Sequence, residues 1–159
     1  MGGYVGFGIA KYAPERFLSL IIGGADPYQE DTQGPDPFVE VLSQGMEAYT
    51  AAMEETFGTR VTPKLRARWQ ANDIEALSAF LSLEERWGFE EILPTITMPC
   101  LLFAGENDPF YPGARKCSEI IPGATFVSLP GLDHIEAAFR TDLTLPHIQR
   151  FLAEVSQIQ

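Results

Sequence analysis

Two short polar turns hold the residues of this chain that could do chemistry. Gly105-Glu106-Asn107-Asp108 offers a carboxylate, and Gly131-Leu132-Asp133-His134 offers an imidazole. Each turn follows an apolar run typical of a buried strand, and a helix-forming stretch separates the two. In α/β proteins the carboxyl ends of parallel strands meet at one edge of the sheet, where the chemistry is placed. We therefore expect Asp108 and His134 to lie together as an acid and a base.

Three apolar runs predict the strands that position these turns. They are short and nearly continuous, as expected for strands buried on both faces of a parallel sheet. The runs cover residues 17–22, 99–104 and 125–129. Two crossovers connect them, and both are expected to be right-handed. The sequence thus predicts an α/β fold with about three parallel strands.

Helices are predicted around these strands. Residues 1–10 form a glycine-rich helix, and four glycines among its first eight residues indicate close approach to neighbouring backbone, since glycine costs about 1 kcal/mol against alanine in a helix. A second helix covers 113–121, and a shorter one runs from His134 to about Arg140. Pro146 is predicted to open the last, amphipathic helix.

A run of capped helices separates the first apolar run from the second. Asp36-Pro37 predicts the start of one helix, which should end near Phe57. Thr62-Pro63 opens another. Asn72 followed by Glu75 resembles a capping box at the start of a third.

This helical block is too long to be an ordinary connection between two strands. We therefore interpret it as an insertion. The predicted organisation is a core segment at 1–27, a helical insertion or cap at 28–94 and a second core segment at 95–159.

Composition and charge exclude several classes of protein. A chain of 159 residues that is 45% hydrophobic can bury a core of its own. Its net charge of -11 disfavours binding to nucleic acid or to an anionic membrane surface. No apolar run approaches the about 20 residues that span a bilayer, and no basic segment precedes an apolar one at the N-terminus. We expect a soluble, cytoplasmic protein with no nucleic-acid or membrane partner.

Neither the cysteines nor the second histidine indicates a further site. Cys100 lies in a strand pattern and Cys117 in a helix pattern, so two buried thiols are expected rather than a disulfide or a CxxC centre. His147, just inside a helix start, is interpreted as a surface or core histidine. A possible set of metal ligands lacks a recognised spacing: His134, His147, Asp133 and Asp142. The sequence therefore predicts no metal and no cofactor.

Taken together, these features resemble the C-terminal half of an α/β-hydrolase. The matching order is Met1-Gly2-Gly3 before a small-residue helix, a strand ending at 22–26, a helical insertion, and the turns 105–108 and 131–134. In that family a serine lies on a strained turn of pattern G-x-S-x-G, often G-x-S-M-G-G, and an acid and then a histidine follow along the chain. Met1-Gly2-Gly3 matches the last three positions of the longer pattern. The resemblance covers essentially the whole chain.

The resemblance implies a role for several residues. His134 would be the general base, and Asp108 would accept a hydrogen bond from its ring. The backbone N–H of Met1 would donate to the oxyanion. Asp26 is the alternative acid, because some branches of the family place the acid after that earlier strand. Asp133 is expected to cap the helix after it.

The resemblance also places the nucleophile immediately before Met1, so we expect the chain to be truncated. No G-x-S-x-G pattern occurs in it, and the nearest stretch, 41–45, lacks the first glycine. Neither Cys100 nor Cys117 lies on a turn. We expect a serine-type hydrolase of esters, lactones or similar small acyl compounds in the full-length parent, with this chain inactive alone. The alternative is a non-catalytic binding or regulatory half-domain.

The substrate is left open among small esters, lactones and compounds cleaved at a carbon–carbon bond. The insertion is expected to form a lid, and four aromatic residues could line an apolar pocket: Phe38, Trp69, Trp87 and Phe110. The strand at 17–22 should have an unpaired edge. Self-association through that edge is therefore expected when the chain is expressed alone.

Overall fold

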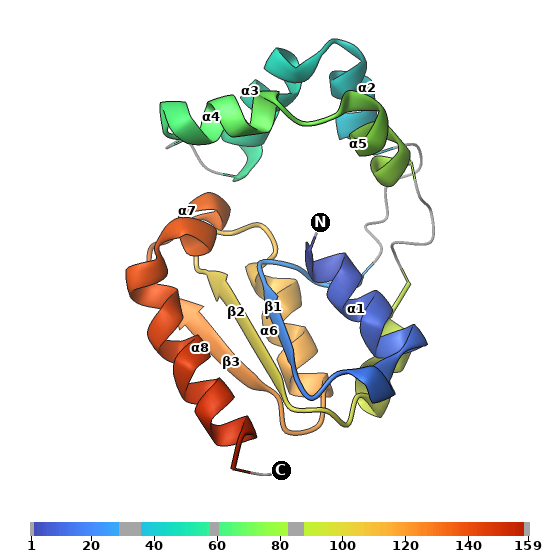
Figure 1. The fold of residues 1–159 in the computed structure, drawn as a ribbon, viewed down its shortest axis with the longest axis vertical. Coiled ribbons are helices and arrows are strands. Elements are labelled where there is room, and N and C mark those ends of the chain that lie inside the picture. The colour runs from blue at the N-terminus through green and yellow to red at the C-terminus, as the bar shows by residue number, and fades with distance from the viewer. Residues whose placement is uncertain (1, 29–35, 58–60, 83–87, 158–159) are drawn as a thin grey trace. The chain divides into compact units, whose positions relative to one another are not determined.

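The computed structural model describes residues 2–28, 36–57, 61–82 and 88–157. The chain divides into two compact units, Met1–Gln29 with Arg86–Gln159, and Glu30–Glu85. Figure 1 gives the order of the elements along the chain. The elements of the first unit are α1 (Gly2–Tyr12), the 3-10 turn η1 (Pro14–Arg16), β1 (Leu20–Gly23), the 3-10 turn η3 (Glu90–Thr95), β2 (Cys100–Gly105), α6 (Tyr111–Ile120), β3 (Thr125–Leu129), α7 (His134–Phe139) and α8 (Thr141–Val155).

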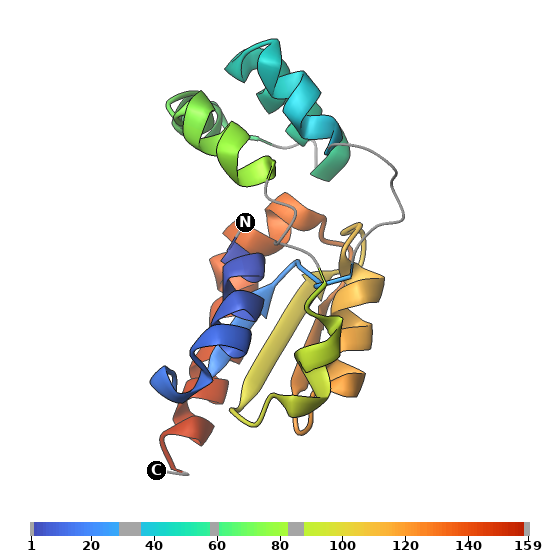
Figure 2. The same cartoon turned by 90° about the vertical axis from the view of Figure 1, so that its right-hand side faces the viewer.

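The described strands form one parallel sheet in the order β1-β2-β3. Leu20 lies opposite Cys100, and Leu101 lies opposite Thr125. The predicted fold, about three parallel strands with flanking helices, is confirmed. The carboxyl ends of the strands and the N-terminal end of α1 lie at the same end of this unit (Figures 1 and 2). The turns that follow β2 and β3 are therefore neighbours.

Helices cover both faces of the sheet. On one face Leu20, Ile22, Cys100 and Leu102 pack with residues of α1, η3 and α6, including Phe7, Leu93 and Cys117. On the other face Ile21, Leu101 and Val127 pack against α8 through Ile148, Phe151 and Val155. The strand β2 is buried along nearly its whole length. Continuous apolar strands are what a sheet covered on both faces requires.

The first strand is shorter than its apolar run predicts. Pairing with β2 begins at Leu20, whose N–H donates to the Pro99 carbonyl at 2.9 Å. Proline has no N–H to extend the ladder further back. Phe17 and Leu18, expected inside the strand, are exposed by 42% and 69% instead.

The second compact unit, Glu30–Glu85, lies within the segment 28–94 that the sequence predicts as an insertion. Phe89 and Leu93 are buried in the core of the first unit. The N–H of Gly88 donates to the Pro27 carbonyl at 3.2 Å, so a residue before the second unit in the chain is hydrogen-bonded to a residue after it. Residues 88–94 therefore belong to the first unit.

The last helix also differs from its prediction. The sequence predicts that Pro146 opens it, but α8 begins at Thr141 and contains Pro146 in its interior. The Arg140 carbonyl accepts from the N–H of Leu143 and of Thr144, which starts the helix upstream of the proline. Phe151 and Val155 are buried, whereas Leu152 is 44% exposed, so the helix is amphipathic.

The second unit is helical. Its elements are α2 (Pro37–Ser43), α3 (Met46–Phe57), α4 (Pro63–Gln70) and α5 (Ile74–Leu81). The caps predicted at Asp36 and Thr62 are present, each accepting from a backbone N–H of its helix. The third cap is Asp73 rather than Asn72. Asp73 accepts from the Ala76 N–H at 3.0 Å, three residues ahead, the spacing that an N-cap requires.

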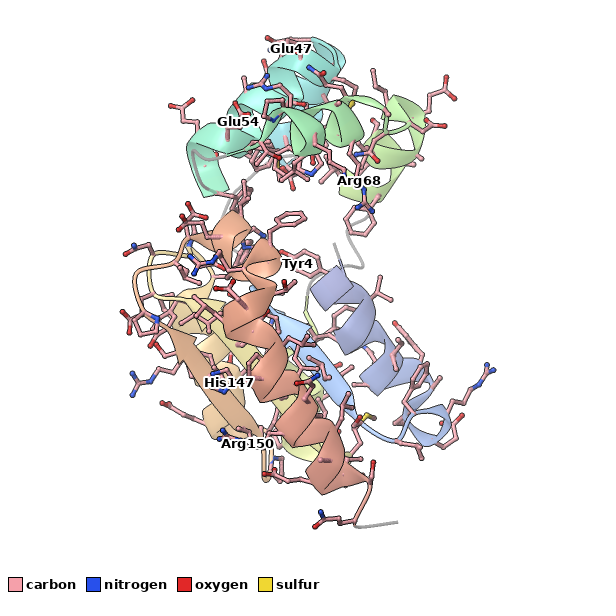
Figure 3. All side chains as sticks on the ribbon, turned by 60° about the vertical axis from the view of Figure 1, so that its left-hand side comes forward. Tyr4, Glu47, Glu54, Arg68, His147 and Arg150 are labelled. Carbon is pink, nitrogen blue, oxygen red and sulfur yellow. The ribbon has the colours of Figure 1, made fainter. Side chains whose placement is uncertain are left out.

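One helix was predicted where the structure has α2 and α3. Gly45 separates them in a left-handed conformation, with φ of 105°. The ring of Phe38 packs against those of Tyr49 and Phe57 across the break. Arg66 of α4 forms ion pairs with Glu47 and Glu54 of α3, both labelled in Figure 3.

Among the described residues, no helix combines the length and the apolar character needed to cross a membrane.

Candidate active site

The acid turn and the histidine turn lie side by side because β2 and β3 are parallel neighbours. Gly105 is the last residue of β2 and pairs with Leu129, the last residue of β3. Beyond them the N–H of Glu106 donates to the Leu129 carbonyl at 3.1 Å. A Cβ atom on Gly105 would overlap the Leu132 carbonyl, so glycine allows the two turns to approach this closely.

Asp108 is fixed in a buried position within its turn. Its N–H donates to the Gly105 carbonyl at 3.0 Å, and its Oδ1 accepts from the Phe110 N–H at 2.9 Å. The carboxylate is fully buried. A buried carboxylate needs partners for its remaining oxygen.

His134 supplies that partner. Its Nδ1 lies 2.9 Å from Asp108 Oδ2, and its side chain keeps 28% of its surface exposed. An ionised carboxylate can only accept, so Nδ1 is the donor in this pair. Such a contact holds the ring in one tautomer and one orientation.

The start of α7 fixes the backbone that carries His134. Asp133 accepts from the Glu136 N–H at 2.8 Å, and Glu136 Oε2 accepts in return from the Asp133 N–H. This is a complete capping box, and it makes His134 the first residue of α7. Asp133 therefore caps the helix as predicted.

Gly24, which directly follows β1, lies beside Asp108 and His134. It has φ of +53° and donates its N–H to the Phe103 carbonyl. A Cβ atom at this position would lie 2.8 Å from Asp108 Oδ2 and 2.9 Å from His134 Nδ1. The backbone of Gly24 thus closes one side of the pair.

Asp26, the alternative acid, makes different contacts. Its Oδ1 accepts from the Tyr28 N–H at 3.0 Å. Its other carboxylate oxygen lies against Gly113, where a Cβ atom would overlap it. The structure brings Asp108, rather than Asp26, to hydrogen-bonding distance of His134.

The predicted pocket aromatics divide between the two units. The Phe110 ring lies 5.6 Å from the His134 ring, tilted by 54°. Phe38 and Trp69 are half-buried on α2 and α4 of the second unit. Trp87 and Met1, the predicted oxyanion donor, lie outside the described residues. Of these residues, only Phe110 is observed beside the pair.

The remaining candidates have other local environments. Cys100 and Cys117 are buried free thiols, and burial raises the pKa of the first to about 11 and of the second to about 12. They are poor nucleophiles for that reason. Ser43, the serine of the nearest G-x-S-x-G-like stretch, ends α2 and donates to the Glu40 carbonyl. His147 projects from α8 one turn before Arg150 (Figure 3).

No cluster of three or more residues suited to binding a metal occurs in the described ranges.

Two residues of the site were not predicted from the sequence. Gly24 was noted only as the end of a strand, and Asn107 only as a turn residue. The side chain of Asn107 donates to the Gly131 carbonyl at 3.0 Å. The double glycine after an apolar run could have indicated the role of Gly24. No local feature of the sequence distinguishes Asn107 from other turn residues.

Comparison with solved structures identifies the fold of this chain. No protein-family model matches the chain, and no curated protein matches it. The enol-lactonase from Burkholderia xenovorans LB400 superposes with a TM-score of 0.85 at 21% identity, over 96% of this chain and 63% of the enzyme. A malate-bound thermophilic esterase from Thermogutta terrifontis gives 0.84 at 21% identity, over 97% of this chain and 62% of the esterase. The chain has the α/β-hydrolase fold.

The solved hydrolase-fold structures are longer than this chain. MenH from S. aureus superposes with a TM-score of 0.79 at 18% identity, and the chain covers 65% of it. The chain thus spans less than two thirds of the length of all three. The resemblance drawn from the sequence is confirmed at the level of the fold.

Proposed function

We propose that Asp108 and His134 are the acid and the base of a serine-type α/β-hydrolase that cleaves an ester, a lactone or a similar small acyl substrate. The observation that carries the proposal is the 2.9 Å contact between His134 Nδ1 and a fully buried carboxylate oxygen of Asp108. The contact joins two turns that are 26 residues apart. Both turns lie at the carboxyl ends of parallel strands, where sheets of this class hold their reactive groups.

The pair performs one half of an acyl transfer. With its proton on Nδ1 facing Asp108, the His134 ring presents the lone pair of Nε2 as the base. Nε2 takes the proton of the attacking serine hydroxyl and later returns a proton to the leaving group. The Asp108 carboxylate stabilises the imidazolium that forms between these steps. The exposed part of His134 leaves room for a substrate.

The substrate class rests on the relatives and on one aromatic side chain. The superposable proteins include an enol-lactonase, esterases and an enzyme that degrades N-acyl homoserine lactones. The names lactonase and esterase describe cleavage of an acyl–oxygen bond. The Phe110 ring beside His134 adds an apolar wall suited to the carbon part of a small acyl group.

The nucleophile is proposed to come from polypeptide outside these 159 residues. No G-x-S-x-G occurs between Met1 and Gln159, and both thiols are buried. The partner of the assembled enzyme is then a small-molecule substrate. The chain alone is expected to be inactive.

A chimera tests this proposal. The chain is joined behind the part of the Thermogutta terrifontis esterase that ends at its proposed nucleophile serine, so that Met1 follows that serine. We expect hydrolysis of short p-nitrophenyl esters. Replacement of His134 by alanine should lower kcat by about 10³-fold or more, since loss of the base in such a triad has an effect of this order.

Two outcomes would contradict the proposal. One is a folded chimera, shown by a cooperative melt, that has no activity above its His134→Ala variant. The other is ester turnover by the 159-residue chain alone that His134→Ala abolishes, because the nucleophile would then lie within the chain.

A further inference from the structure

We propose that Asn107 is a positioning residue, which clamps the acid turn to the histidine turn and so holds Asp108 against His134. The inference rests on the proposed function of that pair. Asn107 precedes Asp108 directly in the chain. Any contact between Asn107 and the turn at 131–134 therefore restrains the position of Asp108 relative to His134.

Asn107 makes two such contacts, one from its backbone and one from its side chain. Its N–H donates to the Leu132 carbonyl at 3.0 Å. Its Nδ2 donates to the Gly131 carbonyl at 3.0 Å. The two acceptors are consecutive and lie two and three residues before His134. The clamp therefore holds the segment that delivers the imidazole.

The rest of the histidine turn transmits this restraint. Gly131 has φ of +70°, and the Leu132 N–H donates to the Leu129 carbonyl, so the turn is tight. Directly after it, Asp133 closes the capping box that starts α7 at His134. Every residue from Gly131 to His134 thus belongs to a hydrogen-bonded turn or to the capped start of α7.

The usual reasons for asparagine in a turn do not apply to Asn107. Asparagine is favoured where φ is positive, but the positive φ values in the described chain belong to glycines. The side chain is exposed, so it does not fill a core. The hydrogen bond to Gly131 is the interaction that distinguishes asparagine from other residues at this position.

The neighbouring Glu106 offers a matched control. It too is exposed, and its carboxylate accepts from Ser128 Oγ at 2.9 Å, which in turn accepts from the Tyr111 hydroxyl. These bonds tie the same turn to β3 and α6. They do not reach residues 131–134. Loss of Glu106 should therefore loosen the turn without releasing the histidine segment.

The test uses the 159-residue chain and the nuclear magnetic resonance of its histidine rings. The chain has two histidines, so His147 on α8 serves as an internal reference. The measured quantity is the rate at which the His134 Nδ1 proton exchanges with water. We expect Asn107→Ala to raise this rate about 5- to 10-fold, the effect of losing roughly one net hydrogen bond, with Glu106→Ala and the His147 signals unchanged.

A second variant guards against general loss of structure. Asn107→Asp keeps the size and shape of the side chain but sets an oxygen against the Gly131 carbonyl in place of the NH₂ group. It should raise the exchange rate at least as much as Asn107→Ala. Melting curves of all variants report whether the fold is kept.

The outcomes separate this inference from the proposed function. If the wild-type Nδ1 proton shows no dependence on Asp108, tested with Asp108→Asn, the proposed pair itself is wrong. If that dependence is present and both Asn107 variants stay within twofold of the wild type, the pair stands and the clamp is wrong. Equal acceleration by Glu106→Ala would also overturn the clamp, because the effect would then belong to the whole turn.

Discussion

Gly24 shows how the contact between Asp108 and His134 depends on a residue that has no side chain. Its φ of +53° is a conformation that side chains resist, and its missing Cβ leaves the space next to Asp108 and His134. Either fact alone would favour glycine. Any other residue at this position would therefore be unfavourable for two separable reasons, one conformational and one steric.

We predict that Gly24→Ala lowers stability more than Gly123→Ala does and that only Gly24→Ala disturbs His134. Gly123 has φ of +71°, and a Cβ there would meet nothing within 4 Å. Both variants should lose about 1–2 kcal/mol in free energy of unfolding, the cost of an L-residue in the left-handed region, and Gly24→Ala should lose more because its Cβ also meets Asp108 and His134. Only Gly24→Ala should shift the ring resonances of His134. Denaturant unfolding and histidine spectra check the two parts, and a ring shift of equal size in Gly123→Ala would refute the steric part.

Residue type and spacing predicted that Asp108 and His134 lie together but not what holds them in place. Asp108 and His134 end polar turns after apolar strands, and this pattern is visible along the chain. Gly24 and Asn107 act across the sheet, on residues from other strands. A contact of that kind depends on which strands are neighbours, which the strand order β1-β2-β3 decides.

At the scale of elements, α1 shows that its glycines are not equivalent. A Cβ on Gly3 would overlap the Ala25 side chain, and one on Gly6 would lie 3.3 Å from Ile22. Gly2 and Gly8 face open space. The sequence predicts close approach to neighbouring backbone, but Gly3 and Gly6 lie mainly against side chains, those of Ala25 and Ile22.

We predict opposite changes in stability for two glycine replacements in α1. Gly8→Ala should raise the free energy of unfolding by about 0.5–1 kcal/mol, because alanine is the better helix former and nothing obstructs its methyl group. Gly3→Ala should lower it by about 1–3 kcal/mol, as overpacking does. Urea unfolding of both variants measures the difference. Changes of the same sign would show that contact with Ala25 does not decide the effect.

The elements were predicted best where sequence and packing agree. The run 125–129 became β3 with the same bounds, because every residue of the run pairs with a residue of β2. Apolar spacing continues across Gly45 and so predicted one helix instead of α2 and α3. Pro146 was taken as a helix start, although the structure begins α8 five residues earlier. Gly45 and Pro146 are each compatible with the boundary of a helix or with its interior. The local sequence does not decide between these two positions.

At the scale of the molecule, the first unit has an open sheet edge within the described residues. The N–H groups of Leu20 and Gly24 donate toward β2. Since donors alternate along a parallel strand, those of Ile21 and Gly23 point away from the sheet. Exposed Phe17 and Leu18 precede this edge. An unprotected edge beside apolar side chains is a template for pairing with another chain.

We propose that a second copy of the chain pairs at this edge when the chain is expressed alone. Sedimentation at increasing micromolar concentrations should show a mass above the 17.6 kDa of the monomer. Leu18→Lys should return the mass toward the monomer, since a charge beside an edge strand opposes pairing. Leu143→Lys, at an exposed leucine of α8, is the control. A monomer at every concentration, with one sharp unfolding transition, would contradict the proposal.

The hydrogen bond between Gly88 and Pro27 has a consequence for the order of folding. Leu20 pairs with Cys100 although the whole second unit lies between them in sequence. Parallel pairing over such a separation is slow, because the loop must close before the contact gains anything. Helices α2 and α5, the first and last of the second unit, contact each other, so a folded second unit shortens the loop that remains to be closed. We therefore expect the second unit to fold early. Pairing of β1 with β2 would follow, across a shorter loop.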